Sequence, residues 1–211
     1  MIRKQSFLFT ILVLLIAGCA GSKPIAYVEK PIVERAVLQQ ASIPNLSVNE
    51  LEKLKKQIEE KWTVRIGDHH ITWNTLEVQK AELDYEAKLK MYTQEEYREK
   101  LRTILEECSN FLSFSGILEG VNSTEAELLE TSSDNIFLIS DSGTKLYPKT
   151  VICDSLSAVI GTTIYHYAAI IISFPESSQI INESTRFIKL VIITGNKRLL
   201  FEWNFSGAPK D

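Results

Sequence analysis

The sequence has little of what catalytic and metal-binding sites are usually built from. It holds three histidines and three cysteines, and none falls at the H-x-H, H-x3-H or C-x2-C spacings of zinc sites. It also lacks a glycine-rich phosphate loop and a G-x-S-x-G nucleophile turn. We therefore expect no catalytic residue, no metal site and no cofactor, although an enzyme assembled from scattered residues stays an alternative.

An excess of positive charge is missing as well. The chain has 23 basic and 27 acidic residues, a net charge of -4. Loss of residues 1–18, with Arg3 and Lys4, would leave 23 − 2 = 21 basic against 27 acidic residues, or -6. Nucleic acids need clustered Lys and Arg to neutralise their phosphates, so this balance predicts no nucleic-acid partner.

The sequence has no apolar run that is long enough to span a bilayer comfortably. The most apolar segment, Phe7–Ala17, would rise only about 16 Å as a helix, whereas the hydrocarbon core is about 30 Å thick. Arg3 and Lys4 precede it. This layout predicts a signal peptide over residues 1–18, which is removed on export.

The apolar segment ends in Ile16-Ala17-Gly18-Cys19. This motif resembles the lipobox of bacterial lipoproteins, in which an aliphatic residue and two small residues precede a cysteine. The resemblance implies cleavage between Gly18 and Cys19, acylation of Cys19, and a membrane as the partner of the acyl chains. Ala20 replaces the aspartate that favours inner-membrane retention, which implies an outer-membrane anchor facing the periplasm in a Gram-negative host. A secreted protein with an incidental cysteine is the alternative.

Residues 19–46 predict a lipidated N-terminus and a flexible tether. They contain Pro24, Pro31 and Pro44 and show no sustained periodicity. We therefore expect the fold not to depend on the first 45 residues.

Residues 47–109 predict a helix–strand–helix region. Ser47–Glu50 and Thr93–Glu96 match the S/T-x-x-E capping box, and apolar residues follow each box at helical spacing. The first stripe (Leu51, Leu54, Ile58 and Trp62) is expected to extend to Ile66, with Gly67 as the C-cap. The second stripe ends at Cys108. Between the helices, Ala81–Met91 alternates apolar and charged residues, which predicts a half-buried strand.

The rest of the chain has the pattern of strands separated by short turns. Candidate strands are Phe111–Leu118, Ile136–Ser140, Thr144–Cys153, Ile164–Phe174, Arg186–Thr194 and Lys197–Phe205, with hairpin turns at Asp141–Gly143 and Gly195–Asn196. Ile164–Phe174 is apolar on both faces, which predicts a central strand. The expected fold class is α+β: short helices and a strand precede a C-terminal antiparallel β-sandwich-like region (110–207), packed with 47–109 as one domain.

Four further segments of the chain resemble a known class of proteins. Trp62, the Tyr92–Tyr97 junction, Tyr167–Pro175 and Leu199–Trp203 make it similar to a class of uncharacterised bacterial envelope lipoproteins. In those proteins a Trp-containing helix and a short strand–helix unit precede a strand-rich half. The resemblance implies this architecture and an envelope location, and it implies no activity.

Histidine can act as a metal ligand or as a general base. Asp68-His69-His70 is the densest group of metal-binding residue types, but adjacent side chains on a strand point to opposite faces, so we interpret it as a solvated loop. His166 is flanked by tyrosines and is interpreted as an interior or edge histidine.

Cys108 and Cys153 form a candidate disulfide. They are the two cysteines that remain once Cys19 is acylated, and exported proteins often pair their cysteines. A bridge would close a loop of about 45 residues and fix the second helix to the sandwich. Two free thiols, packed as small apolar side chains and not catalytic, are the alternative.

These features favour a membrane-anchored envelope lipoprotein with a structural or protein-interaction role. A protein partner is expected at the longest polar loops, Gly120–Asp134 and Glu176–Thr185. One alternative is a lipid- or glycan-binding module, which needs an apolar or aromatic-lined cavity. The other is an enzyme of unrecognised type.

Overall fold

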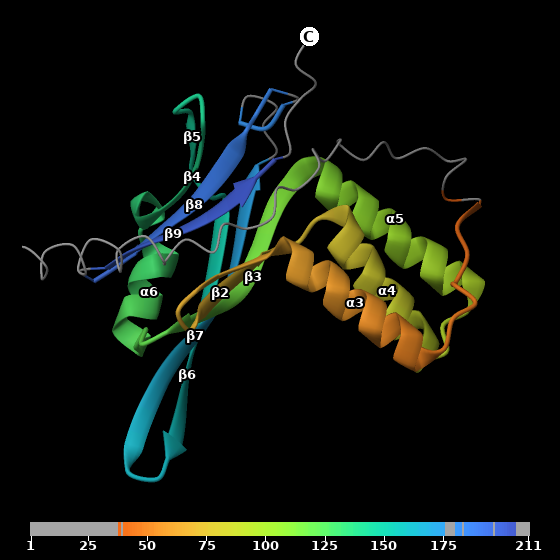
Figure 1. The fold of residues 1–211 in the computed structure, drawn as a ribbon, viewed down its shortest axis with the longest axis horizontal. Coiled ribbons are helices and arrows are strands. Elements are labelled where there is room, and N and C mark those ends of the chain that lie inside the picture. Colours follow the sequence, from red (N-terminus) through yellow and green to blue (C-terminus); the bar gives the residue numbers. More distant parts are fainter. Residues whose placement is uncertain (1–37, 39, 176–179, 183, 196, 206–211) are drawn as a thin grey trace, which may run out of the picture.

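The computed structural model describes residues 38, 40–175, 180–182, 184–195 and 197–205. The elements are α3 (Val48–Trp62), β1 (Thr63–Ile66), β2 (His69–Trp73), α4 (Leu76–Leu89), α5 (Gln94–Asn110), β3 (Phe111–Glu119), α6 (Ser123–Thr131), the 3-10 turn η1 (Ser133–Asn135), β4 (Ile136–Ser140), β5 (Lys145–Leu146), β6 (Thr150–Ile160), β7 (Thr163–Pro175), β8 (Phe187–Thr194) and β9 (Lys197–Asn204). The expected α+β class is confirmed. Helices α3, α4 and α5 lie together beside the sheets, and α6 lies on the other side (Figure 1).

Two antiparallel sheets make up the β part. The five-stranded sheet has the order β1-β2-β3-β7-β6 and the four-stranded sheet the order β5-β4-β8-β9. Every strand pair within them is antiparallel. The expectation of an interior position for Ile164–Phe174 is correct, because β7 pairs with β3 on one side and with β6 on the other.

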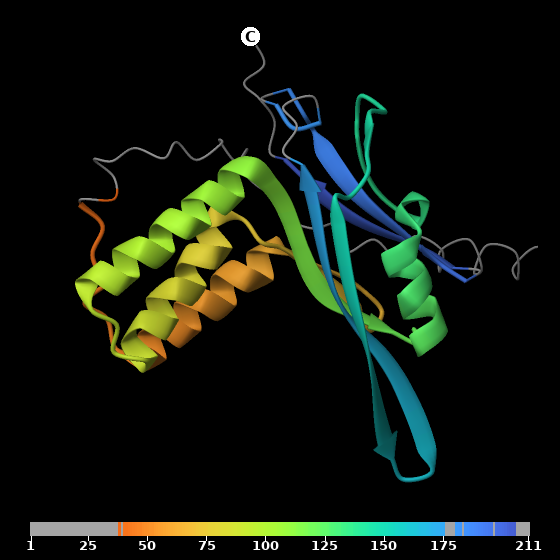
Figure 2. The same cartoon turned by 180° about the vertical axis from the view of Figure 1, so that it is seen from behind.

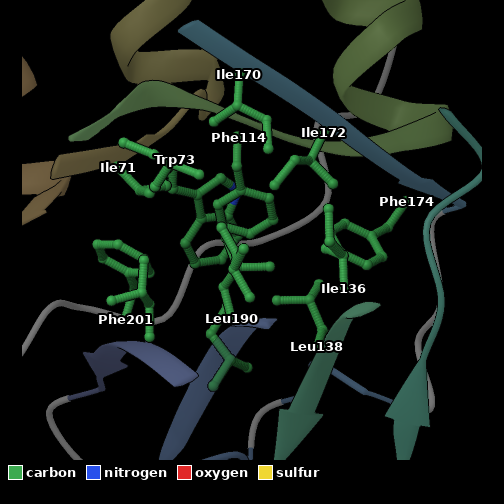
Figure 3. Packing of buried hydrophobic residues seen from close by; sticks show 14 of the residues in the cluster. Ile71, Trp73, Phe114, Ile136, Leu138, Ile170, Ile172, Phe174, Leu190 and Phe201 are labelled. Carbon is green, nitrogen blue, oxygen red and sulfur yellow. The ribbon is translucent and has the colours of Figure 1, made fainter. Parts of the chain in front are cut away.

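The main core lies between the two sheets. Even-numbered residues of β7 from Ala168 to Phe174 are buried, and so are the odd-numbered residues of β9 from Leu199 to Trp203. Figure 3 shows side chains from both sheets meeting there. The Trp203 ring lies 5.2 Å from that of Phe114, and its Nε1 donates to the Trp62 carbonyl at 2.9 Å. This bond ties β9 to the end of α3.

Helix α3 begins as predicted and ends earlier than predicted. Its capping box joins Ser47 and Glu50 in both directions. The helix stops at Trp62, and Ile66 and Gly67 belong to the β1–β2 hairpin instead. The β-branched residues Thr63, Val64 and Ile66 favour a strand. Gly67 takes a φ of +58° in the turn.

The strand expected at Ala81–Met91 is wrong, because this segment lies in helix α4 and its C-terminal turn. Thr75 caps the helix, and Ala, Leu, Glu and Lys are good helix formers. The buried residues Val78, Ala81, Asp84 and Ala87 follow a helical period. The alternation of apolar and charged residues was therefore incidental, and propensity decided the structure.

Helices α4 and α5 share a smaller core, and the chain before α3 contacts it. Leu38, Ala41 and Ile43 pack against this cluster. Gln94 Nε2 and Arg98 Nε of α5 donate to the Ala41 carbonyl at 2.9 and 3.2 Å. The last part of the segment expected to be a free tether is thus packed on α5 as far as the structure describes it.

The strand expected at Thr144–Cys153 is divided into β5 and the start of β6. Pro148 lies in the break, and proline cannot donate to a strand ladder. The Asp141–Gly143 turn is confirmed, with Gly143 at φ +81°. Gly195 has φ +53°, but Asn196 lies outside the described residues.

Candidate interaction surface

The β6–β7 hairpin projects beyond the body of the protein (Figure 2). Its strands pair continuously from Thr150↔Ser173 to Ile160↔Thr163, which leaves Gly161 and Thr162 as a two-residue turn. Gly161 has a φ of +63°, at the position where type II′ hairpin turns favour glycine. The local sequence therefore forms a long, regular hairpin.

Cross-strand partners show that the hairpin has two different faces. Side chains of paired residues lie on the same face of a sheet. Cys153↔Ile170, a buried pair, defines the core face, which continues outward through Ser157↔His166 and Val159↔Ile164. The opposite face is formed by Ile152↔Ile171, Leu156↔Tyr167 and Ala158↔Tyr165.

Apolar side chains are exposed on both faces near the end of the hairpin. Val159 is 70% and Ile164 59% exposed on the core-facing side, and Leu156 is 54% exposed on the other. From Ser155 to Pro175 the chain contains no Asp, Glu, Lys or Arg. Several exposed apolar side chains on one projecting element are a feature of sites that contact another molecule.

The backbone edge of β6 is open over the outer half of the hairpin. Alternate residues of an antiparallel edge strand direct N–H and C=O away from the sheet. In β6 the outward-directed set includes Cys153, because its backbone N–H donates to Glu130 Oε1 of α6 at 2.7 Å. Ser155, Ser157 and Val159 share that orientation and are exposed. No hydrogen bond from their outward backbone groups is made within the described residues.

Sequence reasoning missed this hairpin. The strands expected at Thr144–Cys153 and Ile164–Phe174 left the intervening residues as a loop. A usable signal was present, since Val159-Ile160 and Thr163-Ile164 are β-branched pairs on either side of Gly161-Thr162.

His166 is an edge residue on this hairpin. Its Nδ1 lies 3.1 Å from Ser157 Oγ, and both residues are exposed. Among the described residues, no hydrogen bond joins a carboxylate to the His166 ring to orient this pair as in a catalytic triad. The contact is a cross-strand hydrogen bond.

The Asp68-His69-His70 group belongs to the β1–β2 hairpin. His69 Nδ1 accepts the Glu119 backbone N–H at 3.0 Å. Partial burial and nearby Lys197 lower the pKa of His69, while Asp68 opposes them. A hydrogen bond with Asp68 raises the pKa of the Glu119 carboxyl. Over the described part of the chain, no three His, Cys, Asp or Glu side chains are grouped to hold a metal ion.

A groove of about 530 Å³ lies between α4, α5 and β3. Its polar groups bond to one another: Ser115 Oγ donates to Asn74 Oδ1 at 3.0 Å, and Gln79 Nε2 donates to the Asn74 carbonyl at 3.1 Å. Glu59, Glu82, Glu86 and Lys100 also line it. Val78, Leu83 and Ile104 supply the apolar part of the lining. The groove is therefore mixed in polarity, whereas a lipid carrier needs a mainly apolar cavity.

Cys108 and Cys153 are free thiols in the structure. Cys108 Sγ accepts from Gln79 Nε2 at 3.2 Å, whereas Cys153 is buried in the core between the sheets. Burial, with Glu107 second, raises the pKa of Cys108 to about 12. Burial, followed by Glu130 and Asp154, raises that of Cys153 to about 11. Neither thiol has the lowered pKa of a nucleophile.

The other predicted sites are the N-terminal lipidation site and the two polar loops. Gly18 and Cys19 lie outside the described residues, as does the first part of the loop expected at Glu176–Thr185. The polar loop expected at Gly120–Asp134 is wrong, because most of it forms α6 with an Asn122 capping box. None of the helices in the described ranges combines the length and apolar character needed to cross a bilayer.

Comparisons with known proteins add little. No family model matches the chain, and no curated protein matches it. A solved structure of a protein of unknown function from Burkholderia pseudomallei K96243 is similar over 75% of this chain and 93% of that one, with 11% identity and a TM-score of 0.40. A likeness at this level does not establish a shared function.

Proposed function

We propose that this protein is a membrane-anchored lipoprotein of the cell envelope whose β6–β7 hairpin binds another protein. The observation that carries the proposal is the uncharged segment from Ser155 to Pro175, most of which forms the exposed part of a projecting hairpin with an open edge. Exposed apolar side chains and unpaired strand edges are both features by which sheets recognise protein partners.

The anchor rests on the N-terminal sequence. The basic residues Arg3 and Lys4, the apolar run Phe7–Ala17 and the motif ending at Cys19 have the order of a lipoprotein signal. Ala20 supports an outer-membrane location facing the periplasm in a Gram-negative host. Acyl chains at Cys19 would hold the protein near other envelope proteins, where even weak contacts are populated.

Anchoring is tested by extracting membranes that contain the full-length protein. Acyl burial does not depend on ionic strength, whereas roughly 1 M salt screens charged contacts. We expect the wild type to resist the salt wash and to enter detergent, and Cys19→Ser to stay unprocessed or to become soluble. Release of the wild type by salt alone would contradict an acyl anchor.

Protein binding by the hairpin is tested with a photoreactive amino acid at Val159 of the full-length protein in native membranes. Leu200 on β9 is the matched control, because it is also an exposed aliphatic residue. We expect protein adducts at position 159 and few or none at position 200. Equal labelling of the two positions, or adducts with lipid alone at 159, would overturn the proposed function.

A further inference from the structure

The free edge of β6 has defined limits. Helix α6 covers the edge at Cys153, where Glu130 accepts the outward N–H. The strand ends at Ile160, before the Gly161-Thr162 turn. The outward-facing positions that stay open are therefore Ser155, Ser157 and Val159, with Ser157 at their midpoint.

We infer that the partner of this edge is a second copy of the same chain, paired antiparallel through β6 about a two-fold axis at Ser157. This inference rests on the proposed function, because it names the protein that the hairpin binds. In this register Ser157 faces Ser157 of the second copy, and Ser155 faces Val159 of the second copy. Both N–H and C=O groups at all three positions then find partners.

Charge and side-chain pattern agree with self-pairing. Asp154 is the only charged residue of β6, and in this register the two Asp154 residues lie six positions apart, about 20 Å. They would not repel strongly at physiological salt. Leu156 would neighbour Ala158 of the second copy on one face, so that apolar surface meets apolar surface. Edge strands that avoid pairing usually carry charges or proline, and Ser155–Ile160 has neither.

Lipid would be a poorer partner for the same hairpin. The hydrocarbon core cannot accept or donate hydrogen bonds, so the outward backbone groups of Ser155, Ser157 and Val159 would have no partner there, which is unfavourable. A paired strand satisfies these groups and covers the apolar side chains at the same time. The open edge therefore favours protein over membrane.

Each copy contributes three outward strand positions to this contact, whereas stable soluble complexes bury at least about 1,200 Å². Copies that are tethered to one membrane meet at a raised effective concentration, which compensates for a modest interface. The two-fold arrangement also sets the hairpins side by side, and Gly161 of one copy reaches as far as Cys153 of the other. Helix α6 thus limits how far the two strands can slide.

The register is tested by cysteine crosslinking of the full-length protein in membranes, with copper-phenanthroline as the oxidant. Directly opposed residues in an antiparallel pair have Cα atoms about 5.5 Å apart, which a disulfide can bridge. We expect Ser157→Cys to give a covalent dimer alone. Ser155→Cys and Val159→Cys should give one only when the two variants are expressed together. The wild type, which retains Cys108 and Cys153, sets the background.

A proline variant tests the backbone contribution. The Ser157 N–H points away from β7, so Ser157→Pro removes an outward donor and leaves the intramolecular ladder intact. We expect loss of the dimer in detergent sedimentation for Ser157→Pro, and retention for Ser157→Ala, which removes the same hydroxyl. Hairpin integrity is checked from the melting curve of each variant.

The outcomes separate this inference from the proposed function. Absence of the Ser157→Cys dimer, together with photo-adducts at Val159 to another protein, would overturn self-pairing and leave the protein-binding function standing. Dimers from Ser155→Cys or Val159→Cys alone would overturn the register. Lipid adducts alone at Val159 would overturn both proposals.

Discussion

At the scale of single residues, Trp203 connects more parts of the core than its neighbours on β9. Its ring lies 5.2 Å from Phe114 and 6.3 Å from Trp73, and its Nε1 bonds to the Trp62 carbonyl. Trp203→Ala removes these contacts and leaves a cavity, so the free energy of unfolding should fall by about 3–5 kcal/mol. Leu200→Ala, an exposed site on the same strand, should change it by less than about 0.5 kcal/mol. Denaturant titration measures both, and similar losses would contradict this view of the core.

His69 gives the fold a dependence on pH. Burial lowers its pKa in the folded protein, so the unfolded chain, with an ordinary pKa near 6.5, binds the proton more tightly. The stability due to neutral His69 is present above that ordinary pKa and decreases as pH falls through about 6.5. Protonation would also remove the acceptor of the Glu119 N–H.

The variant His69→Asn tests this effect, because its Oδ1 can replace Nδ1 as an acceptor and does not titrate. We expect the variant to lose less stability than the wild type between pH 7 and pH 5. Denaturant titrations at both pH values measure the difference. An unchanged pH dependence in the variant would remove His69 as a cause. His70, whose pKa burial also lowers, is expected to retain a share of the effect.

Cys108 and Cys153 are expected to react slowly as thiols in the native protein. Both are free in the structure, and their raised pKa values leave little thiolate at neutral pH. We expect slow labelling by a thiol reagent in the native protein and two reactive thiols after denaturation without reductant. Detection of no thiol in the denatured, unreduced protein would establish the Cys108–Cys153 bridge instead.

At the scale of elements, short-range signals were the most predictive. Both capping boxes start helices where expected, because the Ser47 and Thr93 side chains satisfy backbone N–H groups close to them in sequence. Period-two alternation wrongly predicted a strand at Ala81–Met91, where the residues favour a helix. The Tyr97 hydroxyl of α5 also donates to Asp84 Oδ1 of α4 at 2.7 Å, which joins the two helices. Tertiary contacts of this kind are not visible in a local pattern.

The segment before α3 gives an element-scale prediction. A chain that starts at Asn45 lacks Leu38, Ala41 and Ile43 and removes the acceptor that Gln94 and Arg98 share. We expect it to remain folded and to unfold cooperatively, because the core between the sheets is untouched, but at a lower denaturant midpoint than a chain starting at residue 38. An identical midpoint would mean that these contacts do not stabilise the fold. Aggregation would mean that the segment is essential to it.

At the scale of the whole molecule, the sequence predicted the class of the fold better than its arrangement. The prediction of a strand-rich C-terminal half is correct, because neighbouring residues specify the alternating burial of β9 and the turn at Gly143. The pairing of β2 with β3 joins residues far apart in the sequence, such as Trp73 with Phe114 and His70 with Ile117, and no local pattern specifies such pairing. The open β6 edge is likewise a property of the assembled sheet, so the candidate site emerged only from the structure.

The proposed anchor at Cys19 underlies the whole account, because it would place the hairpin at a membrane surface beside other copies and other envelope proteins. The most direct test is the intact mass of the full-length gene product purified from native membranes with detergent. The account predicts a mature chain that starts at Cys19 and carries the added mass of a diacylglycerol and an N-linked acyl chain. A chain that begins at Met1, or an unmodified Cys19, would contradict it.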